Sequence, residues 1–325
     1  MAKLTKDEVK AKIKAKMKRL APAGQLMLGD TSARLVGMMM GLYHHIIGRW
    51  FPPKLRILFS PHEQWQPMLQ KMFKRSGYKV SFGPMTPENV RNNDLIMPLD
   101  QESLESLAPL SAYLASSLLP PPSPATVALC HDKVASWSLL HSCGFDRNLP
   151  AIGADLEPPF FIKPRRGSNP DDYHIIHSLE EAAEAAELIK DRDHYCQAAL
   201  PGRRLYSANI LFREGRIAYM VTVVYHLVDD LAVHGQEGAV RFHRLGLNLH
   251  ATVFTDMLRS LGFEGLCSID YKTTLRGPPR VLEINPFISD GLVRYFPYLL
   301  RHLDYDAWPG AHPAFQSSSG RVSGR

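Results

Sequence analysis

Three oxygen-bearing side chains in the C-terminal third of the chain could together bind a divalent cation. Asp270 lies in the segment 266–271, and Glu283 and Asn285 lie in the segment 281–285. Two carboxylates and a carboxamide that converge are costly to bring together unless a cation sits between them. Oxygen ligands without Cys or His favour Mg²⁺ or Mn²⁺ over Zn²⁺. These three residues are therefore the predicted metal ligands.

The local pattern predicts a hairpin that would bring the three side chains together. Apolar and polar residues alternate on both sides of a turn rich in Gly and Pro, which is typical of two paired strands. If the turn is centred between Arg276 and Gly277, Asp270 and Glu283 face each other across an antiparallel pair, about 5 Å apart at Cβ. Asn285, two residues after Glu283, would project from the same face.

Four upstream segments form an ordered series with this hairpin. C-H-D-K-V at 130–134 precedes a helical pattern, and F-F-I-K-P at 160–164 predicts a strand that leads into a loop. Y-C-Q-A-A-L-P-G at 195–202 follows, and then S-A-N-I-L-F-R-E-G-R-I at 207–217, which predicts a strand, a turn and a second strand.

The order and spacing of these segments resemble the ATP-grasp superfamily, whose last domain ends in an acidic strand residue, a short hairpin and E-x-N-P. The resemblance covers about residues 125–291, roughly half of the chain. It implies that Lys133 and Lys163 hold the phosphates of a nucleotide. It also implies that the backbone around Gly167 and Ser168 closes over those phosphates.

The segment 195–202 resembles the hinge strand that binds adenine in this family. The resemblance implies that Gln197 and the backbone of Ala199 and Leu200 bind the nucleotide. The chain departs from the family pattern at Ala198, where many members have Glu. It departs again after the hinge glycine, where two arginines stand in place of an acidic residue that commonly binds ribose.

A third departure follows the N-P of the hairpin, where this chain has Phe287 and the family often has an Arg near the phosphoryl centre or the acceptor. The nearest substitutes are Arg165, Arg166, Arg241 and Arg294. The predicted catalytic residues are Lys163, Arg241 and Arg294. His243, beside Arg241, is the histidine we expect closest to an acceptor pocket, and the remaining histidines show no metal-binding spacing.

The resemblance implies an ATP-dependent ligase with Mg²⁺ or Mn²⁺ as cofactor. A carboxylate substrate would form an acyl phosphate with ATP, and an amine or another nucleophile would then attack it, with release of ADP and phosphate. The partners would be small-molecule carboxylates and amines, and a homodimer is an open alternative. Two other function classes stay open: an ATP-binding regulatory protein without turnover, and a membrane- or RNA-associated protein acting through its basic N-terminal arm.

The positive charge of the chain belongs to that arm. Residues 1–20 contain eight Lys and Arg and two Asp and Glu, so their net charge equals the +6 of all 325 residues. Thr5 and Glu8 form a capping box that predicts a helix. The apolar segment 33–51 that follows is too short and too polar to span a bilayer. The arm is either a solvated helix or a contact for an anionic membrane surface, and a nucleic-acid partner is not favoured.

Between the arm and the family-like region, the sequence predicts a short Rossmann-like βαβ domain. Strands are expected at 54–60, 78–82 and 94–98, with an amphipathic helix at 63–76. Such alternation predicts a small parallel sheet.

The predicted fold class is α/β (α+β): an ATP-grasp fold preceded by the βαβ domain and a helical arm. Four scattered cysteines match neither a disulfide framework nor a zinc site, so we expect a cytoplasmic protein, with peripheral membrane contact through the arm as the alternative. The expected divisions are an arm at 1–52, a small α/β domain at 53–120, the ATP-grasp region at 121–310 and a disordered tail at 311–325.

Overall fold

The computed structural model describes residues 55–74, 78–114, 117–119, 121–167, 169–273, 277–293, 295–300 and 303. The predicted arm, the predicted tail, Ser168 and Arg294 lie outside the described residues. Within these ranges, no helix combines the length and the apolar character needed to cross a membrane.

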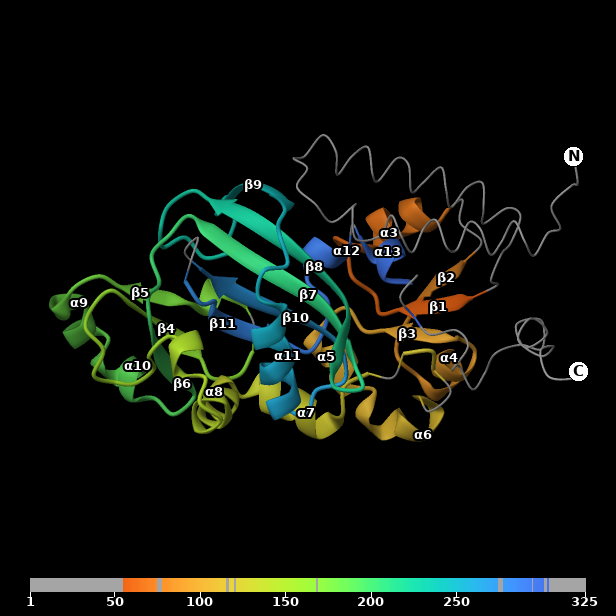
Figure 1. Cartoon of the computed structure of the whole chain (residues 1–325), viewed down its shortest axis with the longest axis horizontal. Helices are drawn as coiled ribbons and strands as arrows, with labels where there is room; N and C mark the ends of the chain where they lie inside the picture. The colour runs from red at the N-terminus through yellow and green to blue at the C-terminus, as the bar shows by residue number, and fades with distance from the viewer. Residues whose placement is uncertain are drawn as a thin grey trace, which may run out of the picture.

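A parallel sheet of three strands, in the order β2-β1-β3, forms the N-terminal part of the described chain (Figure 1). Its elements are β1 (Arg56–Phe59), α3 (Gln66–Phe73), β2 (Lys79–Phe82) and β3 (Leu95–Met97). The strand and helix predictions for this region are confirmed. β3 and the last three residues of β1 are apolar and buried, as strands covered on both faces must be.

Short helices cover both faces of this sheet. Leu58 and Ile96 face one side, together with buried residues of α4–α6, whereas Phe59 and Met97 face the other side, with α3 and the C-terminal helices. The helices concerned are α4 (Pro87–Arg91), α5 (Gln101–Glu105), α6 (Ser111–Leu114), α12 (Asp290–Val293) and α13 (Phe296–Leu299).

An antiparallel sheet of five strands, in the order β11-β10-β7-β8-β9, lies at the centre of the molecule (Figure 1). The strands are β7 (Arg204–Arg213), β8 (Arg216–Leu227), β9 (Val240–Leu245), β10 (Gly265–Lys272) and β11 (Arg280–Asn285). β7 and β8 form the predicted strand, turn, strand. Glu214 and Gly215 connect them with φ of 53° and 69°, and positive φ at both central residues is what a type I′ hairpin turn requires.

One face of the central sheet is closed by α8 (Lys133–Ser142) and α11 (Ala251–Ser260), and α7 (Pro124–His131) precedes α8. Trp137 of α8 and Phe254 of α11 pack there against buried side chains of β7 and β10. The other face carries buried polar residues such as Asn209 and Ser268, and also Leu211 and Leu266, which belong to the same hydrophobic cluster as the parallel sheet.

A third sheet, in the order β5-β4-β6, lies at the opposite end from the parallel sheet and is covered by α9 and α10 (Figure 1). Its elements are β4 (Phe160–Pro164), β5 (His174–Ile176), α9 (Leu179–Glu184), α10 (Ala186–Lys190) and β6 (His194–Ala198). The predicted strand at 160–164 is confirmed, whereas β5 was not predicted.

Candidate active site

The hairpin of β10 and β11 has the predicted register at its functional residues. Asp270 of β10 is paired with Glu283 of β11. Two residues further along β11, Asn285 is paired with Ser268. Side chains of directly opposed residues project from the same face of a sheet. The expectation that Asp270 and Glu283 face each other is therefore confirmed.

A β-bulge next to this pair was not predicted. The register shifts between Asp270 and the following residue, so that Leu282 has no partner on β10. As a result, Leu282 and Glu283 both line the same pocket, while Val281 and Ile284 both enter the core beneath α8 and α11. Bulges commonly re-aim side chains near functional sites in this way.

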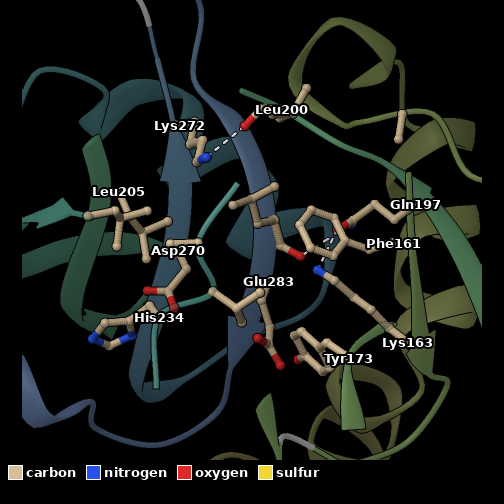
Figure 2. Close-up of a pocket in the computed structure, with 15 residues that line it drawn as sticks. Phe161, Lys163, Tyr173, Gln197, Leu200, Leu205, His234, Asp270, Lys272 and Glu283 are labelled. Atoms are coloured by element: carbon tan, nitrogen blue, oxygen red, sulfur yellow. Dashed lines mark hydrogen bonds between the residues drawn. The ribbon is translucent and has the colours of Figure 1, made fainter. Parts of the chain in front are cut away.

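The pocket lies between the central sheet and the third sheet. Asp270 and His234 stand on one side, Lys163 and Tyr173 stand on the other, and Glu283 lies between them (Figure 2). The pocket thus places carboxylates from one sheet opposite a lysine from the other.

Lys163 is a buried cation on β4. Its Nζ donates to Gln197 Oε1 at 2.6 Å, and it lies 4.8 Å from the ring centroid of Tyr173. Burial lowers the pKa of the Lys163 ammonium to about 8, although the negative charge of Glu283 opposes this shift. Lys163 and Gln197 come from adjacent strands, because β4 pairs with β6.

Lys133 is the first residue of α8 and is also buried. Asp132 caps the helix, and the backbone N–H of Lys133 donates to Arg165 O at 3.1 Å. The Nζ of Lys133 lies 3.5 Å from Glu283 Oε1 and donates to Gly167 O. The two lysines therefore approach Glu283 from the helix and from the third sheet.

Asp270 carries an oxygen that the described residues leave unsatisfied. Its Oδ1 is buried and has no hydrogen-bond partner among them. Burial raises the pKa of the Asp270 carboxyl to about 6. Such an oxygen fits a bound cation, which would supply the missing partner.

The described residues contain no group of three His, Cys, Asp or Glu side chains placed to hold a metal. The candidate metal ligands are thus two carboxylates, Asp270 and Glu283, and the carboxamide of Asn285. Asn285 shares a face with Glu283 by register but does not line the same pocket.

The backbone groups of the hinge after β6 form hydrogen bonds with other residues of the chain. The N–H of Ala199 donates to Pro159 O at 3.1 Å, and Leu200 O accepts from Lys272 Nζ at 2.7 Å (Figure 2). Gln197, whose Oε1 accepts from Lys163, lines the pocket together with Leu200.

Of the predicted arginines that the structure describes, Arg165, Arg166 and Arg241 do not line the pocket. Arg241 is exposed on β9, and its guanidinium donates to Val228 O at 3.4 Å. Arg165 and Arg166 pair with Asp132 at 2.8 and 3.4 Å.

Phe287, which stands where the family often has an Arg, packs against the cluster that contains Leu58 and Ile96 of the parallel sheet. The structure thus gives this departure a packing role between the central and N-terminal parts of the chain.

Three polar pocket residues were not predicted: Tyr173, His234 and Lys272. The position of Lys272 could have been predicted, because it lies two residues after Asp270 on the same strand and must project from the same face. Tyr173 and His234 come from loops, where no periodicity indicates which side chains point inward.

No protein-family model matches the chain, and no curated protein matches its sequence. Solved structures do resemble it. An L-amino acid ligase from Bacillus licheniformis is 17% identical with a TM-score of 0.53, covering 74% of this chain and 69% of that chain. A D-alanine–D-alanine ligase from Bacillus anthracis is 14% identical with a TM-score of 0.51, covering 72% and 87%.

A carboxyaminoimidazole ribonucleotide synthase from Aspergillus clavatus, solved with ATP, is 13% identical with a TM-score of 0.50, covering 73% of this chain and 71% of that chain. At these identities the comparisons show the fold. The chain has a mixed fold of the α+β class, and this is the ATP-grasp fold that the order of its motifs predicted.

Proposed function

We propose that this protein is an ATP-dependent carboxylate–amine ligase. In the reaction, a carboxylate oxygen attacks the γ-phosphorus of ATP, and ADP leaves. The nitrogen of an amine then attacks the carbonyl carbon of the acyl phosphate, loses a proton, and displaces phosphate. ATP and two small molecules would be the substrates, as the similarity in fold to known ligases and to an ATP-bound synthase suggests.

The observation that carries this proposal is a pocket in which Asp270 and Glu283 face Lys163, with Lys133 lying 3.5 Å from Glu283. Phosphoryl transfer depends mainly on alignment and on neutralisation of charge. Two buried lysines from different elements and two paired carboxylates are the groups that such a transfer needs.

Each residue would have a defined part in binding. Lys133 and Lys163 would contact the phosphates, and the carboxamide of Gln197 keeps the ammonium of Lys163 in place through its 2.6 Å hydrogen bond. Asp270, Glu283 and the nearby Asn285 would hold Mg²⁺, which offsets negative charge on the phosphates when bound.

The test is Mg²⁺-dependent release of ADP in the presence of pooled amino acids, small carboxylic acids and peptides. We expect Asp270→Asn and Glu283→Gln each to abolish ADP formation, because the shape of the side chain is kept and its charge is lost. Glu187→Gln, which changes an exposed carboxylate on α10, is the matched control and should leave turnover unchanged. Normal turnover in both site variants would refute the assignment of the metal ligands.

A regulatory protein that binds ATP without turnover is the second candidate function. The observation that favours it is the hinge, because the Ala199 N–H and the Leu200 carbonyl are already engaged within the chain. Calorimetry with ATP and Mg²⁺ separates the two candidates: binding without ADP release for any pooled substrate would favour regulation.

A further inference from the structure

A cluster of Asp290, Tyr225 and His234 lies beside the proposed reaction pocket. Asp290 is the first residue of α12, and its Oδ1 accepts a hydrogen bond from Tyr225 Oη at 2.5 Å. His234 Nε2 lies 3.9 Å from Asp290 Oδ2, and the His234 ring lies 4.0 Å from the Tyr225 ring. None of these residues belongs to the phosphate or metal groups described above.

The chain fixes the position of Asp290 on both sides. The preceding residue, Ser289, donates from its N–H and its Oγ to the buried Asn209 Oδ1 at 3.2 and 2.8 Å. The following residue, Gly291, lies so close to the sheet that a Cβ there would be 2.8 Å from Tyr225 Oη. Asp290 is therefore held directly above β8.

The cluster adjoins the proposed metal ligands. His234 lines the same pocket as Asp270 and Glu283, and Figure 2 shows it beside Asp270. Burial is the main cause of the raised pKa of Asp270; the charge of His234 opposes it, and the negative charges of Glu283 and Asp290 add to it. Asp290 is thus near enough to Asp270 for their charges to interact.

This end of the site is anionic and open. The side chain of Asp290 is 47% exposed, and its Oδ2 has no hydrogen-bond partner among the described residues. None of the described Lys or Arg residues forms an ion pair with it, and Lys133 and Lys163 lie around Glu283 instead. A half-exposed carboxylate whose second oxygen has only the His234 ring nitrogen nearby, at 3.9 Å, is suited to a cationic ligand.

We propose that Asp290 is the binding residue for the ammonium group of the second substrate, with Tyr225 holding its carboxylate in place. The second substrate is then a cationic amine when it binds, and its nitrogen loses one proton, which the Asp290 carboxylate can accept, before it attacks the acyl phosphate. This inference rests on the proposed function for its place in the reaction, but the binding of an ammonium group can be measured without turnover.

The test uses 1,4-diaminobutane as the cationic probe and 1,4-butanediol as its uncharged counterpart, titrated by calorimetry into the full chain with saturating Mg²⁺. We expect the diamine to bind and the diol not to bind. Asp290→Asn should weaken diamine binding by at least about tenfold. Tyr225→Phe, which keeps the carboxylate but removes its donor, should weaken it by a smaller factor. Glu237→Gln, on the exposed part of the same loop as His234, is the matched control and should bind as the unaltered chain does.

Equal binding of diamine and diol, or unchanged diamine binding in Asp290→Asn, would overturn the inference. If Asp290→Asn does not fold, Tyr225→Phe decides the same question, because a normal affinity there contradicts the role of the Tyr225 and Asp290 pair. Diamine binding that depends on Asp290 in a chain that never releases ADP would support the ammonium site and reject the proposed ligase activity.

Discussion

At the scale of single residues, the site gathers buried charges whose pKa values are shifted toward their neutral forms. Burial lowers the pKa of Lys163 to about 8 and raises that of Asp270 to about 6. Each shift means that the folded chain disfavours the charged form that ligand binding needs. Functional sites commonly carry such groups. The free energy that it costs to bury their charges is offset only when the ligand is bound.

Asp270 should therefore destabilise the protein above pH 6 when no metal is bound. Its carboxyl has an ordinary pKa of 3.8 and a pKa of about 6 in the folded chain, so folding favours the protonated form. Stability falls as the pH rises from about 4 through 6, and the full penalty applies above that range. We expect Asp270→Asn to raise the free energy of unfolding at pH 7 by about 1–3 kcal/mol, measured by urea denaturation.

Two controls belong to this prediction. The advantage of Asp270→Asn should vanish below about pH 4, where the unaltered carboxyl is protonated in both states. Added Mg²⁺ should stabilise the unaltered chain at pH 7 but not the variant. A variant that is less stable than the unaltered chain at pH 7 without metal would contradict the burial argument.

Lys163→Met should weaken ATP binding by about 1.5–3 kcal/mol, the usual range for a hydrogen bond to a charged group. Because the pKa of Lys163 is about 8, the affinity of the unaltered chain should also fall as the pH rises through 8. The variant should lack the part of this pH dependence that Lys163 provides. Calorimetry between pH 7 and pH 9 measures both effects, and equal ATP affinity at pH 7 would show that Lys163 does not contact the nucleotide.

At the scale of elements, the functional hairpin was predictable because its alternation is strong. The register of Asp270 and Glu283 followed from the position of the turn, and β10 pairs with β11 as expected. The bulge at Leu282 was not predictable, because the sequence does not show which residue of the second strand is left without a partner. β5 was missed because it has only three residues.

The cluster around Asp290 was also beyond sequence reasoning. Its members come from a strand, a loop and the start of a helix, and they meet only because of how the chain folds. Gly291 shows how close this packing is, since a Cβ there would lie 3.0 Å from Val223 Cγ2. The short helix α12 can rest on β8 only with a residue that has no side chain at this position.

Gly291→Ala should therefore destabilise the protein by about 1–3 kcal/mol, as overpacking usually does. The new methyl group would push α12 away from Tyr225 and disturb the position of Asp290. Gly83→Ala is the control, because its Cβ would meet only the Asn89 amide at 3.3 Å. Thermal unfolding of both variants measures the difference. Equal stability in both variants would mean that α12 can shift freely.

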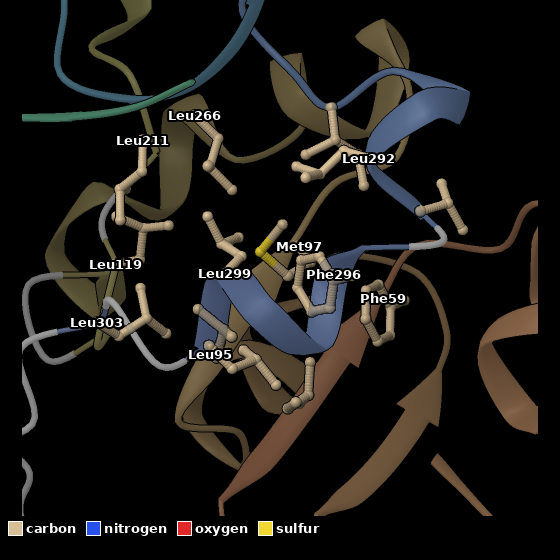
Figure 3. Close-up of a cluster of buried hydrophobic side chains, with 14 of the residues drawn as sticks. Phe59, Leu95, Met97, Leu119, Leu211, Leu266, Leu292, Phe296, Leu299 and Leu303 are labelled. Carbon is tan, nitrogen blue, oxygen red and sulfur yellow. The ribbon is translucent and has the colours of Figure 1, made fainter. Parts of the chain in front are cut away.

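At the scale of the whole molecule, one hydrophobic core joins the two ends of the described chain. Figure 3 shows Phe59 and Leu95 of the parallel sheet, Phe296 of α13, and Leu211 and Leu266 of the central sheet in the same cluster. The chain thus returns at α12 and α13 to cover the sheet with which the described residues begin. Burial patterns of this kind can preserve a fold when few residues are identical, which agrees with identities of 13–17% among the similar structures.

Phe296→Ala should weaken this shared core, because the Phe296 ring lies 5.2 Å from that of Phe59 and 6.2 Å from that of Phe73. Loss of a fully buried Phe side chain costs about 3–5 kcal/mol. Phe242→Ala is the matched control, since that ring is 54% exposed and its loss should cost far less. Urea denaturation followed by tryptophan fluorescence and by circular dichroism should give one shared transition at a lower midpoint. Two separate transitions would show instead that the parallel sheet unfolds independently of the central sheet, and that α13 does not hold the two together.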